Sequence, residues 1–185
     1  MLKIAIILGS TRPNRVGESV ASWVLDAARK RSDAEFALVD LAEIDLPMLD
    51  EGVPPSLGQY ANQHTKDWAA IVAAYDAFIF VVPEYNHSIS GALKNALDFV
   101  YGEWNNKVAG FVGYGSVGGA RAVEHLRLVM AELQVATVRA QVGLSLFTDF
   151  ENFSEFKPIA RHEQELNGVI DQVIAWGGAL KTLRG

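Results

Sequence analysis

Five short apolar runs recur along the chain, and each predicts a β-strand. The runs at 3–8 and 77–82 show no alternation of apolar and polar residues, which is typical of parallel strands buried on both faces. The five predicted strands are residues 3–8, 35–40, 77–82, 107–112 and 136–142.

Apolar residues at helical spacing follow these strands and predict amphipathic helices. The first helix has an apolar stripe made of Val20, Trp23, Val24, Ala27 and Ala28. The helix that begins near residue 92 has a buried stripe made of Leu93, Ala96, Leu97 and Val100. On its other face Lys94 and Asp98 are spaced as an i,i+4 surface pair. The predicted helices are residues 18–30, 60–75, 92–101, 119–133 and 159–183.

Strands that alternate with helices along the whole chain predict a parallel sheet with helices on both faces. Five such strands indicate an α/β fold, a flavodoxin-like three-layer sandwich with strand order 2-1-3-4-5. Residues 45–57 are rich in proline and form a predicted loop. Residues 143–157 are irregular, with four phenylalanines expected to pack, at 147, 150, 153 and 156. Since no repeat or domain boundary is visible, we expect one domain over residues 1–185.

Composition narrows the chemistry and the partners. The chain has no cysteine, which excludes disulfides and thiolate nucleophiles, so redox chemistry requires a bound cofactor. Its net charge of −6 argues against nucleic acid as a partner. The first apolar run ends at Leu8, and no run approaches the roughly 20 residues of a membrane helix. We therefore expect a cytoplasmic protein with no membrane partner and no metal site.

The loop from Gly9 to Gly17, between the first strand and the first helix, has the chemistry of a phosphate site. A helix N-terminus offers free N–H groups and partial positive charge, and hydroxyl and guanidinium groups add donors. The spacing does not match a Walker-type loop. From the residues alone, a polar turn with two solvated arginines is an equally good interpretation. The candidate ligands are Ser10, Thr11, Arg12, Arg15, Val16 and Gly17.

The segment Pro83–Asp98, PEYNHSISGALKNALD, leaves the end of the most apolar strand. In a doubly wound fold such a loop lies where ligands bind. Through this segment and the 9–17 loop, the chain resembles the NAD(P)H-dependent FMN reductase family of flavodoxin-like flavoproteins, which includes quinone, azo-dye and chromate reductases. The resemblance covers about residues 3–142.

The resemblance implies FMN as the bound cofactor and NADPH or NADH as co-substrate. It also implies that the 9–17 loop grips the FMN phosphate, most directly through Ser10, Arg12 and Gly17, and that the second loop meets the isoalloxazine ring. A flavin needs an apolar wall and N–H donors from such a loop. The candidates in this ring loop are Pro83, Glu84, Tyr85, Asn86, His87 and Ser88.

Residues 113–118, GYGSVG, match the dinucleotide fingerprint G-x-G-x-x-G by spacing. Their place after the fourth strand, and the absence of an acidic residue at the end of the next strand, disfavour that interpretation. In the family that the chain resembles, the segment Y-G-x-x-G-G-x-R lies beside the flavin pyrimidine and the nicotinamide site. The resemblance therefore implies flavin contacts from Tyr114, Gly115, Ser116, Gly118 and Gly119.

Several residues keep two interpretations. Glu84 either tunes the flavin or, as we favour, caps or pairs locally, and His87 is either a proton donor or a residue at the substrate entrance. Arg121 either reaches an NADPH phosphate or lies on a solvated helix face. The resemblance places residues 45–50 near a dimer seam and the methyl-bearing edge of the flavin. Two aromatic residues either contribute to the flavin site of a neighbouring subunit or are ordinary core residues. They are Tyr101 and Trp104.

We therefore expect an FMN-dependent NAD(P)H oxidoreductase that reduces quinones, azo compounds, flavins or similar small-molecule acceptors. The resemblance implies ping-pong hydride transfer through flavin N5, with no catalytic side chain, in a homodimer or homotetramer. The alternatives are a flavodoxin-type electron carrier without NAD(P)H oxidase activity, an interaction module without flavin, and a nicotinamide dehydrogenase that uses residues 113–118.

Overall fold

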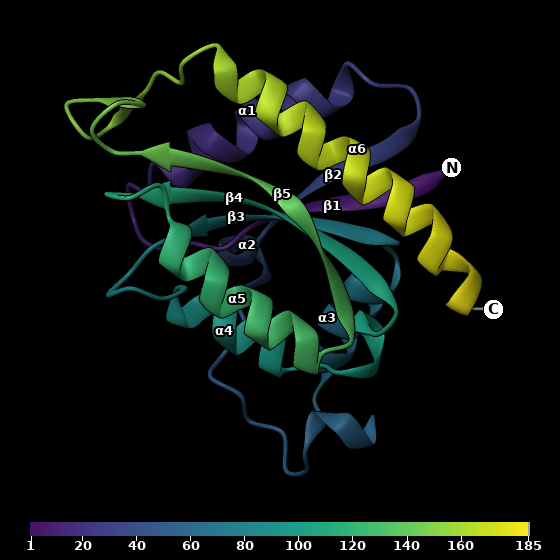
Figure 1. Ribbon diagram of the computed structural model, residues 1–185. Helices are drawn as coiled ribbons and strands as arrows, with labels where there is room; N and C mark the ends of the chain where they lie inside the picture. Colours follow the sequence, from purple (N-terminus) through teal and green to yellow (C-terminus); the bar gives the residue numbers. More distant parts are fainter. Residues whose placement is uncertain (185) are drawn as a thin grey trace.

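A five-stranded parallel sheet forms the centre of the computed structural model, which describes residues 1–184 (Figure 1). The strands lie in the order β2-β1-β3-β4-β5, and every neighbouring pair is parallel. This confirms the predicted flavodoxin-like topology. The strands are β1 (Leu2–Leu8), β2 (Ala34–Asp40), β3 (Ala77–Pro83), β4 (Lys107–Gly115) and β5 (Val135–Ser145).

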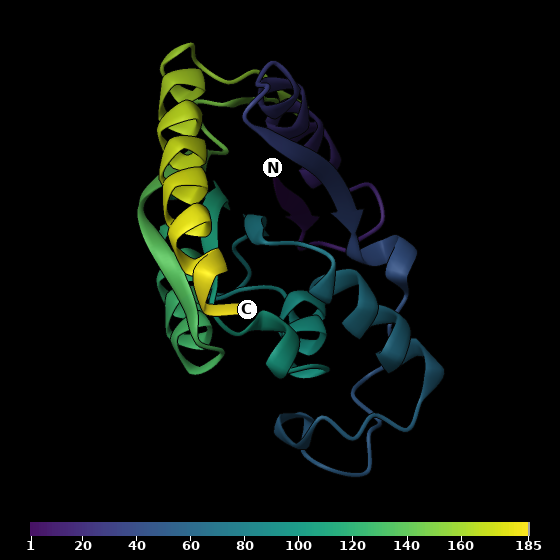
Figure 2. The same ribbon diagram turned by 90° about the vertical axis from the view of Figure 1, so that its right-hand side faces the viewer.

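Helices cover both faces of the sheet, as the two views in Figures 1 and 2 show. Helices α1 (Gly17–Arg29) and α6 (Arg161–Lys181) pack on one face. The other face is covered by α3 (Gln63–Ala73), α4 (Gly91–Asp98) and α5 (Ala120–Glu132). No helix in the described part of the chain is long and apolar enough to cross a bilayer.

Alternate residues of the central strands enter opposite layers of the core. On β1, Ile6 packs in the cluster that contains α1 and α6, whereas Ile7 packs in the cluster that contains α3 to α5. Strand β3 repeats this arrangement with Ile79 and Phe80, and all four side chains are at most 1% exposed. Burial of each such side chain contributes about 1.5–3 kcal/mol. The uninterrupted apolar runs in the sequence follow from this burial on both faces.

The ends of several elements differ from the prediction. Helices α3 and α4 are shorter than predicted, whereas β4 and β5 extend past residues 112 and 142. Residues 113–115 therefore belong to β4, although the glycines at 113 and 115 made this stretch of sequence look like a turn. The short helix α2 (Leu41–Ile44) was not predicted.

The irregular segment after β5 contains an antiparallel ribbon that the sequence pattern did not predict. Its strands, β6 (Phe150–Glu151) and β7 (Glu155–Phe156), are too short for alternation to be visible. Phe150 and Phe156 pack on each other, with ring centres 5.2 Å apart. Phe147 and Phe153 also pack on each other, with ring centres 5.7 Å apart, but outside the core, since they are 68% and 62% exposed.

A buried polar cluster fastens this segment to α6. The Asp149 carboxylate is 1% exposed and lies 3.0 Å from His162 Nε2, at the start of α6. It also accepts hydrogen bonds from the Ser145 amide and the Thr148 hydroxyl, both at 2.9 Å. The other imidazole nitrogen, Nδ1, lies 2.7 Å from Glu165. Asp149 thus holds the segment by its side chain.

We expect the substitution Asp149→Ala to lower the free energy of unfolding by about 2–3 kcal/mol, because it leaves buried donors without an acceptor. The matched control is Glu151→Ala, in the same segment, whose carboxylate is paired with Lys157 in solvent. Exposed pairs are worth about 0–1 kcal/mol. Urea denaturation of both variants measures the difference, and equal losses would show that Asp149 has no special structural role.

Candidate functional site

Three loops meet at the carboxyl ends of β1, β3 and β4, which are neighbours in the sheet. The Gly9 amide at the end of β1 donates to Val81 on β3 at 3.0 Å, and the Glu84 amide after β3 donates to Tyr114 on β4 at 3.0 Å. The Ser90 hydroxyl donates to the Gly9 carbonyl and caps α4 by accepting the Leu93 amide. The parallel topology therefore brings the three predicted loops to one edge of the sheet.

The first loop leaves donors without partners. The N-cap of α1 is Val16, whose side chain cannot cap, so the first amides of α1 have no side-chain acceptor among residues 1–184. Thr11 and Arg12 are exposed beside this helix end. Ser10 is fully buried, and its hydroxyl lies 3.1 Å from the Tyr85 hydroxyl of the second loop. This donor set suits a phosphate group.

Arg15 was expected either to be solvated or to bind the phosphate, and its side chain does not lie in either position. Its guanidinium is 7% exposed and forms an ion pair with Asp40 at the end of β2. It also donates to the Ser10 carbonyl, so it braces the loop against the sheet. Of the two arginines in the loop, Arg12 has the exposed side chain.

The second loop is a tight turn over residues 85–88. The Tyr85 and Ser88 amides and carbonyls pair in both directions, at 2.9 and 3.0 Å. Asn86 and His87 have φ values of 49° and 68°, in the left-handed region that non-glycine residues seldom adopt. Their amides have no backbone acceptor in the described part of the chain. Such strain is found at functional sites, and these free N–H groups are the kind that a flavin edge requires.

Glu84 anchors the second loop to α5. Its carboxylate is 4% exposed, pairs with Arg121 and accepts the Arg121 amide at 3.1 Å at the start of that helix. Burial raises the pKa of Glu84, but the hydrogen bonds from Arg121 and Ala122 outweigh it and lower the pKa below its ordinary value. The favoured interpretation of Glu84 as a capping and pairing residue is confirmed. Arg121 is also 2.8 Å from His87 Nε2, so it is not simply a solvated residue.

The third loop is a compact turn between β4 and α5. Gly118 and Gly119 have φ values of 69° and 68°, and the Gly118 amide donates to Gly115 at 3.1 Å. Tyr114 is 6% exposed, and burial raises the pKa of its phenol well above the ordinary value. Its ring lies in the core and points toward the first loop, where a Cβ added at Gly17 would lie 2.5 Å from the Tyr114 hydroxyl oxygen. The remaining predicted residue of this loop, Ser116, is exposed.

The helix after the second loop agrees with its predicted faces. Its four-residue apolar stripe is at most 2% exposed, and Lys94 lies 2.7 Å from Asp98. Asn95 exchanges hydrogen bonds with Pro47 and Leu49, which fixes the 45–50 loop against α4. Trp104 is fully buried and packs on Phe78, with ring centres 4.8 Å apart, so it is a core residue.

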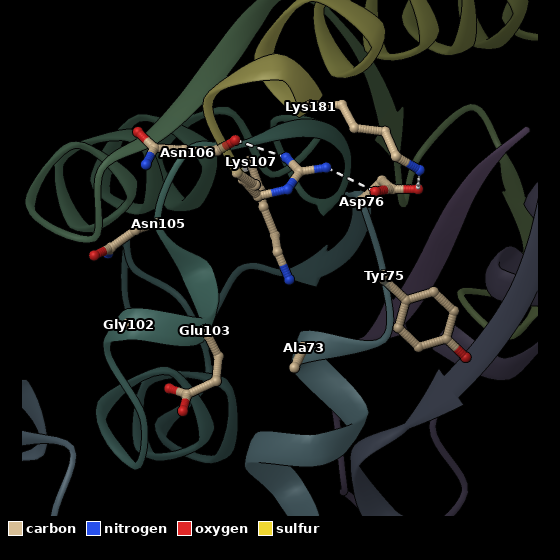
Figure 3. Close-up of a pocket in the computed structure, with 10 residues that line it drawn as sticks. Ala73, Tyr75, Asp76, Gly102, Glu103, Asn105, Asn106, Lys107 and Lys181 are labelled. Atoms are coloured by element: carbon tan, nitrogen blue, oxygen red, sulfur yellow. Dashed lines mark hydrogen bonds and ion pairs between the residues drawn. The ribbon is translucent and has the colours of Figure 1, made fainter.

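A pocket of about 270 Å³ opens between the first loop and α4. It is lined by Thr11 together with residues of α2, the 45–50 loop and α4, including Asp45, Leu46, Ala92 and Asn95. A larger pocket, of about 630 Å³, lies at the opposite end of the strands (Figure 3). Of these two pockets, only the smaller one, beside the phosphate loop, is lined by a predicted site residue.

Two parts of the site were missed by the sequence analysis. Asp40, the partner of Arg15, ends β2, and an acidic residue at a strand end beside the phosphate loop was the available signal. His125 on α5 lies with Nδ1 3.1 Å from the Ser88 hydroxyl, and only its helical spacing from Arg121 could have indicated this. Each of them contacts a side chain of one loop: Asp40 pairs with Arg15, and His125 is hydrogen-bonded to Ser88.

Comparison with known proteins agrees with this geometry. The family model for NADPH-dependent FMN reductase matches residues 2–149. An NAD(P)H-dependent FMN reductase of Nectria sp is 40% identical over 159 residues, which cover 80% of this chain and 79% of that protein. An FMN-dependent NADPH-azoreductase of Staphylococcus aureus is 29% identical over 180 residues and 95% of each chain.

Solved structures give the same fold. The flavoenzyme NAD(P)H:(acceptor) oxidoreductase FerB from Paracoccus denitrificans superposes with a TM-score of 0.76, at 21% identity, over 97% of this chain and 98% of its own. The match of the family model over most of the chain, and the 40% identical relative, decide the classification. The chain belongs to the NADPH-dependent FMN reductase family.

Proposed function

We propose that the chain is an FMN-dependent NAD(P)H oxidoreductase that reduces quinones, azo compounds, flavins or similar small organic acceptors. Family membership confirms the enzyme class and the cofactors FMN and NAD(P)H that the sequence predicted. The choice of acceptor is our proposal. The observation that supports it most is the set of unpaired donors on three loops at one exposed edge of the sheet, within the part of the chain that the structure describes.

The donor set fits FMN group by group. The Thr11 hydroxyl, the Arg12 guanidinium and the first amides of α1 would hold the phosphate dianion. The amides of Asn86 and His87 would meet the polar edge of the ring, and the turn that contains Ser116 would lie along its pyrimidine. When bound, FMN supplies the redox chemistry that a chain without cysteine lacks.

The protein's own contribution is binding, orientation and hydrogen bonding. N–H groups fixed by the tight turns of the second and third loops stabilise negative charge at the ring without rearranging. A guanidinium only donates, so His87 Nε2 accepts from Arg121 and Nδ1 carries the proton. We place His87 at the substrate entrance, where this Nδ1–H is available to an acceptor oxygen.

The proposal has two further parts, of which the oligomeric state rests on the family resemblance. We propose that the chain forms a homodimer or homotetramer, with the 45–50 loop near the seam. We also propose a cytoplasmic location. Light scattering of the purified protein, at several concentrations, tests the first part, and a monomer at all of them would contradict it.

We expect ping-pong kinetics, because NAD(P)H and the acceptor use the same opening above the loops in turn. Initial rates measured at several fixed concentrations of a soluble quinone should give parallel double-reciprocal lines against NADPH. Intersecting lines would indicate a ternary complex and contradict this order. A protein that holds FMN but does not oxidise NADPH or NADH would instead support the electron-carrier alternative.

A further inference from the structure

Two exposed phenylalanines pack against each other in the segment that follows β5. The rings of Phe147 and Phe153 meet edge to face, at an angle of 86°. Neither side chain packs in either layer of the core formed by residues 1–184. An aromatic ring stabilises a fold mainly through the area that it buries, so this pair contributes little to the fold. It does offer an apolar contact to a ring-shaped ligand.

The backbone at Phe153 is a second, independent observation. Asn152 and Phe153 are the central residues of the turn that follows β6, which the Ser154 amide closes on the Glu151 carbonyl at 3.1 Å. Their φ values are 52° and 57°. Turns with two such residues favour asparagine and glycine, so Phe153 occupies a position that suits glycine. A bulky residue in this conformation is strained, and strain of this kind is found at functional sites.

The segment that carries the pair is fastened to the third loop of the candidate site. The Leu146 amide donates to the Gly115 carbonyl at 3.0 Å. The Ser145 hydroxyl donates to the Ser116 carbonyl and accepts the Phe147 amide, both at 3.2 Å. Figure 1 shows this segment beyond the carboxyl ends of β4 and β5, at the end of the sheet where the three loops meet. Phe147 therefore lies next to the loop proposed to contact the flavin pyrimidine.

The charge near the turn discriminates between the two substrates of the proposed reaction. Glu151 and Glu155 flank the turn, and both pair with Lys157, so these three groups carry one negative charge in excess. NAD(P)H carries at least two phosphate charges, which an acidic surface repels, whereas an uncharged ring is not repelled. The surface therefore suits an uncharged electron acceptor better than it suits NAD(P)H.

We propose that Phe147 and Phe153 are specificity-determining residues, which bind the aromatic part of an uncharged acceptor and favour fused-ring quinones over compact, non-aromatic acceptors. This inference rests on the proposed function, because it requires an acceptor that reacts at a flavin held by the three loops. The two rings act by contact alone. They strengthen binding of the acceptor and take no part in electron transfer.

The test compares two acceptors on the FMN-loaded protein. Menadione is an uncharged fused-ring quinone, and ferricyanide is compact and has no aromatic ring. We expect Phe147→Ala and Phe153→Gly each to lower the ratio of kcat/KM for menadione to kcat/KM for ferricyanide by about 3- to 10-fold, the worth of one aromatic contact. The loss should appear as a higher KM for menadione at unchanged kcat. The control is Leu128→Ala on α5, where an exposed apolar side chain is lost elsewhere, and its ratio should equal that of the parent.

Urea denaturation and light scattering of the same variants exclude two other roles. Because glycine adopts the φ of Phe153 without strain, Phe153→Gly should have a urea midpoint at least as high as that of the parent. A lower midpoint would show that Phe153 serves the fold and would overturn the proposal. A change of oligomeric state in either phenylalanine variant would show that the pair contacts a second copy of the chain, and would overturn it too.

The outcomes also separate this inference from the proposed function. If the parent reduces both acceptors and the ratio is unchanged in both phenylalanine variants, only the role of the two rings is overturned. If the parent does not hold FMN, or oxidises neither NADPH nor NADH, the proposed function fails and this inference fails with it.

Discussion

Replacement of Gly119 by valine should lower the free energy of unfolding by about 3–5 kcal/mol and abolish FMN binding. Gly119 has a φ of 68°, which a β-branched residue adopts only at a cost of about 1–3 kcal/mol. An added Cβ would lie 2.6 Å from the Tyr114 nitrogen and 2.9 Å from the Gly113 carbonyl carbon. Both are backbone atoms of β4 and cannot move aside, so overpacking adds about 1–3 kcal/mol.

The loss of FMN follows because the valine pushes the third loop away from β4, and the second loop is tied to the start of α5 through Glu84. Urea denaturation and FMN fluorescence titration measure the two effects. Gly178→Ala on α6 is the control, since no atom lies within 4 Å of its added Cβ. It should raise stability by about 0.5–1 kcal/mol and leave FMN binding unchanged. A Gly119→Val protein as stable as the parent would contradict the close approach of this turn to β4.

The substitution Arg12→Ala should weaken FMN binding by about 10- to 100-fold without changing the free energy of unfolding. Arg12 is exposed at the uncapped start of α1, so its side chain contributes to a bound phosphate and not to the fold. A hydrogen bond to a charged group is worth about 1.5–3 kcal/mol, which gives this range.

Arg15→Ala is the matched comparison in the same loop. Its guanidinium is 7% exposed and pairs with Asp40, so its loss should lower the free energy of unfolding by about 1–3 kcal/mol and weaken FMN binding through the loop. FMN titration and urea denaturation of both variants separate the two roles. If Arg12→Ala bound FMN as tightly as the parent, the assignment of Arg12 to the phosphate would be wrong.

The fold was predictable because burial on both faces of the sheet makes the sequences of the central strands almost entirely apolar. Strands β1 and β3 are apolar on both faces, and their order follows once strands alternate with helices. The ends of β4 and β5 were not predictable, since Gly113, Gly115 and Gly143 have no side chain through which a pattern could show. The ribbon at 150–156 is held by tertiary contacts of Asp149, which local pattern does not record.

The candidate site, like the fold, was predictable only in part. Its three loops were predictable, because a parallel fold places all strand ends of one kind at the same edge. The roles of single residues within the loops depended on partners far away in the sequence. Arg15 became a brace through Asp40, and Glu84 became a cap through Arg121. Such pairings require the register of the sheet, which no local motif supplies.

The central claim is that these loops hold FMN and that NAD(P)H reduces it there. The most direct measurement is titration of the purified protein with FMN, followed by anaerobic addition of NADPH and, separately, NADH. We predict binding of one FMN per chain, and bleaching of the bound flavin's visible absorbance by at least one of the two nucleotides. Failure to bind FMN, or a bound flavin that neither nucleotide bleaches, would contradict the account.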